Sequence, residues 1–196
     1  MGFFGNLFNR LFNKNKQKNT PARISERSKS MTIDIQGDCF VINGKKFEIP
    51  MHVDALSAIL GNPRTVKFNT TPEMRAFLEE MEGAPVTNRV NYAWDDLGLM
   101  CYTLNGKVIN AFGIHLRQQT HNSPANPEMH FSGKITINGQ HWLPIVMSGV
   151  DEDTSRRVIL GALSLTASYS DYYQDDSTRD ETSFSAFEIQ LKNSDD

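Results

Sequence analysis

The stretch CFVINGKKFEI, residues 39–49, places an Asn-Gly pair between two strand-like runs. The same arrangement returns in LMCYTLNGKVINAFGIHL, residues 99–116, and in GKITINGQHWLPI, residues 133–145. Asparagine and glycine tolerate the positive φ angles that two-residue hairpin loops require, and β-branched or aromatic residues flank each pair. The sequence therefore predicts three antiparallel hairpins.

Helical patterns separate these hairpins. Residues 53–60 place apolar side chains on one helical face and precede Gly61, a residue type that often ends helices. Residues 70–83 begin with Thr-Thr-Pro-Glu and end in glycine, which predicts a second helix. Residues 153–165 fit a short helix followed by a strand, and residues 187–192 alternate as a half-buried strand does. We therefore expect an α+β fold, a single antiparallel sheet built from hairpins with two or three helices mainly on one face.

Charge is distributed unevenly along the chain. The 196 residues carry a net charge of −3, made up of +6 over residues 1–30, −2 over residues 31–149 and −7 over residues 150–196. We therefore predict a basic arm and flexible tether over 1–30, then one domain over 31–196 with an acidic C-terminal third. A hydrophobic fraction of 39% supports a folded core, and no apolar run is long enough to span a membrane. We expect a cytoplasmic protein.

The first twelve residues, MGFFGNLFNRLF, form an apolar stripe when they are arranged as a helix. The members of the stripe are Phe3, Phe4, Leu7, Phe8, Leu11 and Phe12. Lysines follow directly, so the arm has the composition of a segment that lies on an anionic membrane. Docking on the protein's own body and insertion into a partner protein fit the same pattern. The sequence leaves these three roles open.

Motifs of catalysis and cofactor binding are absent from the sequence. It contains no HExxH, Walker or Gly-x-Gly-x-x-Gly pattern and no Gly-x-Ser-x-Gly elbow. Cys39 and Cys101 stand in apolar runs, where cysteine is usually a small buried hydrophobe. We therefore predict no cofactor, no metal, no small-molecule substrate and no enzymatic activity. An enzyme that uses His121, Glu128 and His130 is an alternative, although their spacing supplies no metal-binding scaffold.

Residues 91–98, NYAWDDLG, combine two aromatic residues with two adjacent carboxylates. Asp95 and Asp96 point to opposite sides of an extended chain, so both can face one cation only where the backbone turns. One interpretation is a strand end and turn, with Trp94 in the core and the aspartates bonded to backbone amides. The other is a protein interface, because aromatic residues anchor a partner and carboxylates steer it.

Tyrosines and acids gather again in the acidic C-terminal third. The candidate partner-binding residues there are Tyr172, Tyr173, Asp175, Asp176, Asp180 and Glu181. Their charge attracts a basic protein and repels phosphate, so nucleic acid is not expected as a partner. A solvated loop whose tyrosines cover a sheet edge is the alternative interpretation.

Several motifs occur in an order that resembles one known family. They are Gly61-Asn62-Pro63-Arg64, the run from Trp94 to Gly98, and Phe112-Gly113-Ile114, all within residues 31–150. In this order they are similar to small bacterial immunity proteins encoded beside polymorphic toxins, and the opening MGFFGNLF is similar to theirs. The resemblance implies a non-enzymatic cytoplasmic protein that occludes the active site of a toxin. Toxins of this class include nucleases and ADP-ribosyltransferases, some of them delivered on Rhs-repeat proteins.

The resemblance and the charges together predict an immunity protein that neutralises a cognate antibacterial toxin. We expect Trp94, Asp95, Asp96 and the segment from Tyr172 to Glu181 to contact the toxin. The alternative is a peripheral membrane scaffold that the Phe-rich arm anchors.

Overall fold

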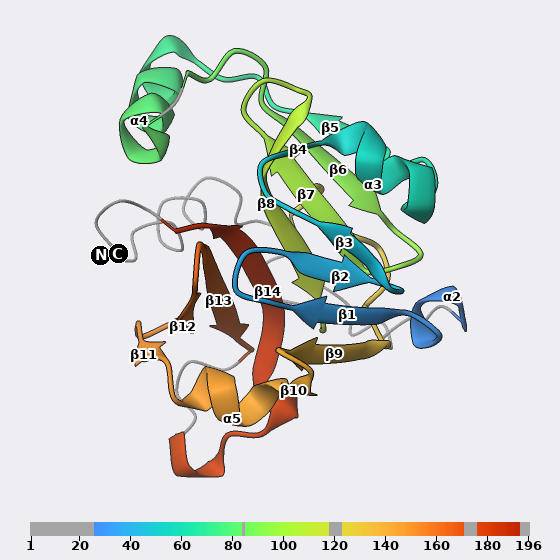
Figure 1. The fold of residues 1–196 in the computed structure, drawn as a ribbon. Helices are drawn as coiled ribbons and strands as arrows, with labels where there is room; N and C mark the ends of the chain where they lie inside the picture. The colour runs from blue at the N-terminus through green and yellow to red at the C-terminus, as the bar shows by residue number, and fades with distance from the viewer. Residues whose placement is uncertain (1–25, 84, 118–122, 171–175, 193–196) are drawn as a thin grey trace, which may run out of the picture.

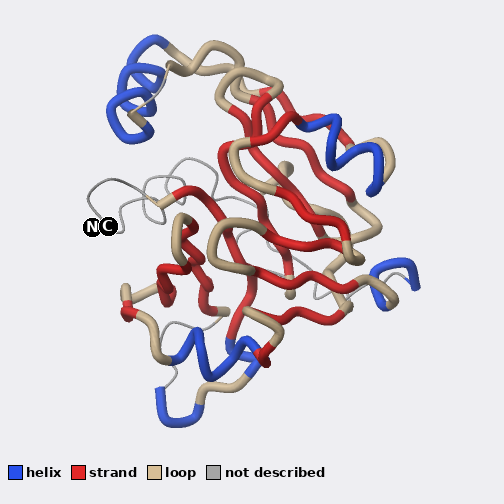
Figure 2. Tube along the Cα trace, viewed as in Figure 1, coloured by secondary structure: helices blue, strands red, loops and turns tan. Residues whose placement is uncertain are grey.

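Two β-sheets that face each other form the body of the protein (Figure 1). The structure is a computed structural model that describes residues 26–83, 85–117, 123–170 and 176–192. Strands make up most of the described chain, with short helices between them (Figure 2).

The smaller sheet has five strands in the order β10-β9-β1-β2-β3. Their bounds are Thr32–Ile35 (β1), Phe40–Ile42 (β2), Lys45–Phe47 (β3), Lys134–Ile137 (β9) and Gln140–His141 (β10). Strands β1 and β9 are parallel, and across this pair Thr136 Oγ1 donates a hydrogen bond of 2.6 Å to Asp34 Oδ1, 102 residues away. The sheet therefore depends on a pairing between distant parts of the chain.

The larger sheet has nine strands, all of which pair antiparallel. Its order is β11-β12-β13-β14-β8-β7-β6-β5, and β4 pairs with the start of β8. The bounds are Met51–His52 (β4), Arg64–Lys67 (β5), Val90–Trp94 (β6), Leu99–Thr103 (β7), Val108–His115 (β8), Val150–Asp151 (β11), Ser155–Leu160 (β12), Leu163–Tyr169 (β13) and Phe184–Leu191 (β14).

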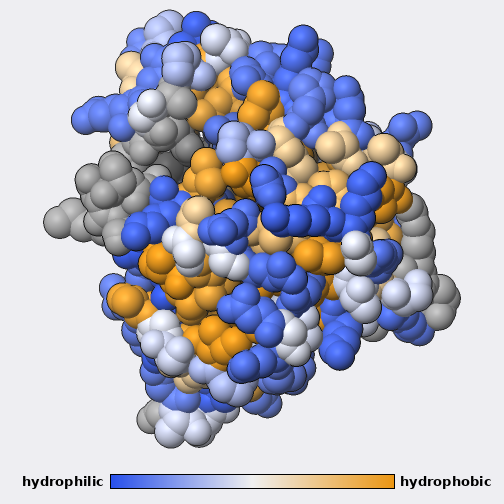
Figure 3. All heavy atoms as spheres, in the orientation of Figure 1, coloured by the Kyte–Doolittle hydropathy of each residue, from blue (hydrophilic) through white to orange (hydrophobic). Residues whose placement is uncertain are grey.

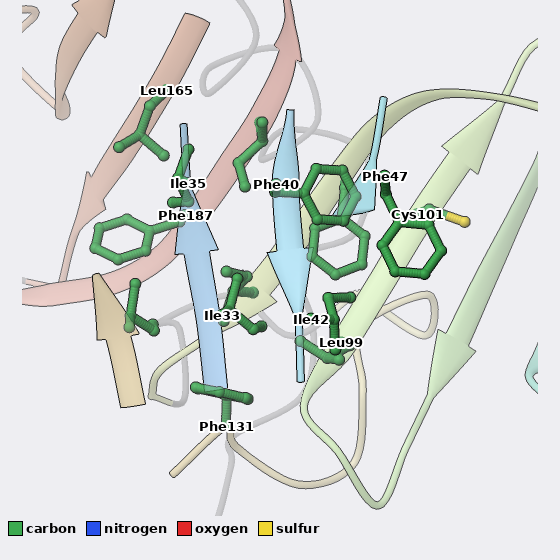
Figure 4. Packing of buried hydrophobic residues seen from close by; sticks show 14 of the residues in the cluster. Ile33, Ile35, Phe40, Ile42, Phe47, Leu99, Cys101, Phe131, Leu165 and Phe187 are labelled. Carbon is green, nitrogen blue, oxygen red and sulfur yellow. The ribbon is translucent and has the colours of Figure 1, made fainter. Parts of the chain in front are cut away.

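The hydrophobic core lies between the two sheets (Figure 4). Phe40 of β2 is fully buried and stacks on Phe112 of β8, with ring centroids 4.7 Å apart. It also stacks on Phe47 of the neighbouring strand at 5.7 Å. Leu99 and Cys101 of β7 join the same cluster from the larger sheet. Cys39 and Cys101 are both buried. Cys101 lies in the apolar cluster, as predicted, whereas the Cys39 thiol donates to Gln36 Oε1 at 3.4 Å.

Two of the three Asn-Gly pairs form the predicted two-residue hairpin loops. Asn43 and Gly44 have φ angles of 48° and 81°, and Asn138 and Gly139 have φ angles of 51° and 74°. The remaining pair, Asn105-Gly106, lies in a longer loop, because Thr103 pairs with Ile109 rather than with a closer residue. There Asn105 Oδ1 accepts hydrogen bonds from the amides of residues 107 and 108.

The helices are spread around the body and do not gather on one sheet face (Figure 1). The predicted helices are confirmed as α3 (Val53–Leu60) and α4 (Pro72–Glu82), with Thr71 as the N-cap of α4 and Gly83 at its end in the left-handed region. Helix α4 lies at one end of the body and α5 (Trp142–Met147) at the opposite end (Figure 1). The short helix α2 (Glu26–Lys29) precedes β1.

The predicted fold class is wrong in its architecture. The protein is mostly β and has two sheets, not a single antiparallel sheet with helices mainly on one face. Asn-Gly turns mark hairpins locally, but they do not show which sheet each hairpin joins. The first and third hairpins belong to the smaller sheet and the second to the larger one.

Two local predictions are also wrong. Residues 155–160 and 163–169 form a hairpin, so the expected helix after residue 153 is absent. Conversely, the run after the third Asn-Gly pair continues as a strand for only two residues and then forms α5. Pro144 lies in the first turn of α5, where a helix tolerates proline. The strand predicted over 187–192 is confirmed, since β14 covers Phe184–Leu191.

Candidate functional site

Three apolar side chains of helix α5 pack against the edge of the core and are only partly covered. Trp142 and Val146 point into the core, whereas Leu143, Ile145 and Met147 are only partly buried. Val150 of β11 follows them with 63% of its surface exposed. We name these four side chains, Leu143, Ile145, Met147 and Val150, the apolar patch. Figure 3 shows apolar atoms gathered over α5, β11 and β12.

Four acidic residues, Asp151, Asp176, Asp180 and Glu181, lie beside this patch, and we name them the acidic rim. Asp176 begins the 3-10 turn η1 (Asp176–Thr178), and Asp180 caps the 3-10 turn η2 (Glu181–Ser183). Thr182 donates to Asp180 Oδ1 from its hydroxyl at 2.5 Å and from its amide at 2.7 Å. The hydroxyl and then the amide hold the pKa of Asp180 below its ordinary value. Asp180 is therefore ionised at neutral pH.

A buried arginine ties the rim to the patch. Arg156 of β12 donates to the backbone oxygens of Met147 at 2.7 Å and Gly149 at 3.0 Å, and its Nε donates to the Tyr169 hydroxyl at 3.0 Å. Its Nη2 donates to Asp176 and, at 3.4 Å, to Asp151. One guanidinium therefore fixes the end of α5, the start of β11 and the turn η1 together.

The carboxylates of these ion pairs face solvent and the guanidinium groups lie beneath them. The Arg156 and Arg179 side chains are 10% and 4% exposed, whereas their shared partner Asp176 is 43% exposed. Arg179 also stacks on the Tyr169 ring, with its guanidinium carbon 3.5 Å from the centroid. Because the positive halves are buried, an approaching molecule meets the negative halves first.

The rim is joined to α5 at its other end as well. His141 Nε2 and Glu181 Oε1 form a hydrogen bond of 2.8 Å, and both side chains are more than half exposed. Next to it, Trp142 packs edge-on against Phe184 and Phe187, with ring centroids 5.5 Å and 4.9 Å away. The patch and the rim therefore form one rigid surface.

The other predicted partner-binding residues have structural partners. Trp94 is 2% exposed, and its Nε1 donates to the Gly61 oxygen at 2.7 Å. Asp95 accepts two hydrogen bonds of 2.7 Å from Arg64 and one of 3.1 Å from the amide of Glu128. Asp96 is half-buried in the same turn. This geometry matches the interpretation of residues 91–98 as a strand end and turn.

The turn at Trp94 lies far from the acidic rim. Across the larger sheet, Trp94 is in register with Leu99, and the same row continues through β8, β14 and β13 to Arg156. Five strand spacings correspond to roughly 24 Å. A surface centred on the rim therefore does not include Trp94, Asp95 and Asp96.

Several predicted residues lie outside the described parts of the chain. They are Tyr172, Tyr173 and Asp175, and the whole apolar stripe of the arm from Phe3 to Phe12. The roles predicted for them stay predictions. Of the predicted tether, the described end contacts the body, because Ser28 is buried and its hydroxyl accepts a 2.8 Å hydrogen bond from the amide of Ser132.

Residues 32–147 match the model of a family described as Domain of unknown function (DUF7738). This match covers more than half of the chain. The chain belongs to this family. No curated protein and no solved structure matches it. The DUF7738 match contains the whole smaller sheet and α5, but it ends before β11–β14, so the acidic rim lies outside it.

The described residues contain neither a metal-binding cluster nor a membrane-spanning helix. Among the described residues, no three His, Cys, Asp or Glu side chains converge on a metal position, and no helix there is long and apolar enough to cross a membrane. Of the three residues of the alternative enzyme, His121 lies outside the described residues. The amide of Glu128 is bonded to Asp95, and the Nδ1 atom of His130 is buried without a hydrogen-bond partner.

A buried histidine makes the fold sensitive to acid. His115 is 7% exposed, and its Nε2 lies 3.1 Å from Met100 Sδ. Burial, with a smaller effect from His130, lowers the pKa of His115 from 6.5 to about 4. Between about pH 6.5 and about pH 4, His115 is therefore protonated in the unfolded chain and neutral in the folded chain. The free energy of unfolding falls as the pH is lowered through this range. The full loss is about 3 kcal/mol, of which about 1 kcal/mol has been lost at about pH 5.5.

Urea unfolding at pH 7.5 and 5.5 would measure this loss, with His115→Gln as the comparison. The variant should be less stable at both pH values, but it should lose about 1 kcal/mol less than the parent protein between them. Equal losses in the two proteins would show that His115 does not set the acid sensitivity.

The sequence gives weak signals for the parts of the site that it failed to predict. Pro144 within an apolar run could have indicated the start of α5. Nothing in the sequence distinguishes Arg156, which is buried, from Arg157, which pairs with Glu152 nearer the surface.

Proposed function

We propose that the protein is an immunity protein that acts in the cytoplasm, binds a cognate antibacterial toxin and occludes the toxin's active site without catalysing a reaction. The observation that carries this proposal is the surface in which an apolar patch adjoins a rim of outward-facing carboxylates. Protein interfaces commonly combine a central apolar cluster with a polar margin. The resemblance of the sequence to small bacterial immunity proteins supports the same function.

The chemistry of the surface indicates the kind of toxin. Exposed carboxylates over buried arginines attract a basic surface and speed its association. The active sites of nucleases and of enzymes that bind dinucleotides are basic, because they hold phosphate groups. An acidic inhibitor therefore complements such a site, and the apolar patch supplies the contact that slows dissociation.

Two variants of the full chain test the surface against the toxin domain encoded beside this gene. Val150→Asp places a charge in the apolar patch, and we expect it to weaken binding at least tenfold, mainly through faster dissociation. Glu181→Gln removes an exposed rim charge, and we expect it to slow association two- to fivefold at low salt and much less at high salt. Biolayer interferometry measures both rates.

Matched controls are available on other surfaces. Phe77 of α4 is 41% exposed, so Phe77→Asp changes an exposed apolar residue at the opposite end of the body. Glu48 is 64% exposed and pairs with Lys46, so Glu48→Gln removes a comparable charge. Unchanged toxin binding in Val150→Asp and Glu181→Gln would refute this surface, and a neighbouring gene that encodes no toxin would refute the function.

A further inference from the structure

A polar hollow of about 370 Å³ lies beside α4. Helix α4 is at the end of the body opposite to α5 (Figure 1). Two chain segments form it, residues 68–71, which lead into α4, and residues 86–89, which follow it. The side chains that matter for its chemistry are Thr70, Arg75, Thr87, Asn88 and Arg89. Its volume falls within the range of small-molecule sites, about 300–1,000 Å³.

Backbone hydrogen bonds hold the two segments in place. The amide of Phe68 donates to the Arg89 oxygen at 3.3 Å, which joins one segment to the other. The amides of Thr87 and Asn88 both donate to the Leu104 oxygen, at 3.0 Å and 2.9 Å. The Arg89 guanidinium lies over the Phe68 ring, 4.7 Å from its centroid, so its direction is set before any ligand arrives.

The charge of the hollow is positive. Among the residues that the structure describes, two arginines and no carboxylate line it. Glu79 of α4 accepts a 2.9 Å hydrogen bond from the amide of Val86. Glu73 lies in the first turn of α4, where hydrogen bonds from its own amide and from Thr71 lower its pKa. The positive charge therefore comes from the two guanidinium groups and not from the N-terminus of α4, whose amides Glu73 and Thr71 already satisfy.

We propose that this hollow binds the phosphate group of a small phosphorylated molecule. Arginine presents paired N–H donors that match phosphate oxygens, and it does so at Arg75 and Arg89. Hydroxyl and amide side chains such as Thr87 and Asn88 supply further donors in the same space. The polar lining disfavours an apolar ligand. This site is separate from the toxin-binding surface, so either proposal can fail alone.

Titration of the full chain with inorganic phosphate and with adenosine 5′-monophosphate, followed by amide NMR at constant ionic strength, tests the proposal. We expect saturable shifts confined to residues 68–75 and 86–89, and tighter binding for the nucleotide if the base contacts the Phe68 face. Arg75→Gln alters an exposed helix residue, so it should fold normally and weaken binding about tenfold or more.

Lys67→Gln is the matched control, because it removes a neighbouring exposed positive charge that does not line the hollow. It should weaken binding no more than about twofold, as a screened charge outside the site does. Shifts that stay linear with ligand concentration would overturn the proposal, as would equal binding in Arg75→Gln and the parent protein. Binding of glutamate as tight as that of phosphate would overturn the assignment to phosphate.

Discussion

Arg156→Met is expected to lower the free energy of unfolding by about 3 kcal/mol, because it removes the donor that joins α5, β11 and the turn η1. The guanidinium satisfies two backbone oxygens, the hydroxyl of Tyr169 and two carboxylates while only 10% of its side chain is exposed. Methionine fills a similar volume but donates no hydrogen bond, so the oxygens of Met147 and Gly149 and the Tyr169 hydroxyl lose their donor.

The neighbouring residue provides the control for this prediction. Arg157 pairs with Glu152 at 2.7 Å and is 31% exposed, so Arg157→Met should cost less than about 1 kcal/mol. Urea unfolding followed by circular dichroism compares the two variants at the same pH. Similar losses in both would show that the Arg156 network does not hold this end of the protein together.

Loss of Arg156 would also disturb the surface that we propose for toxin binding. Asp176 is anchored by Arg156 and Arg179, so loss of either arginine frees part of the acidic rim. A substitution that neutralises Asp176 removes a rim charge and also breaks its ion pairs with Arg156 and Arg179. Its effect on binding therefore could not be assigned to charge alone. Glu181 is the sharper choice, because its partner His141 is itself exposed.

Local features of the fold could be predicted from the sequence, and long-range ones could not. The Asn43-Gly44 loop and the caps of α4 are decided by a few adjacent residues, which the sequence displays directly. The parallel pairing of β1 with β9 joins segments about a hundred residues apart and depends on the packing of two sheets. No local pattern contains that information, so the sequence predicted one sheet where the structure has two.

In the candidate site as well, local features could be predicted and long-range ones could not. The composition of residues 176–181 indicated a charged surface, and the structure places the acids there on two 3-10 turns. The apolar half of the surface was missed, because a strand was expected where α5 forms. The sequence allowed two interpretations of Trp94, as a core residue or as an anchor for a partner protein. The structure places it in the core, with 2% of its surface exposed.

Phe40→Ala is expected to have the largest effect of the variants considered, a loss of about 3–5 kcal/mol in the free energy of unfolding. Phe40 is fully buried and stacks on Phe112 of the opposite sheet and on Phe47 of its own. Alanine would leave a cavity between two sheets whose backbones are held by their own ladders, so the space cannot close fully.

Val41→Ala is the control, because residue 41 is next in the strand and its side chain points to the outer face, where it is half-buried. It should cost less than about 1 kcal/mol. A double variant with Phe112→Ala should lose less than the sum of the two single losses, because the same ring contact is removed twice. Additive losses would mean that Phe40 and Phe112 do not contact each other, and therefore that the two sheets do not share the core described here.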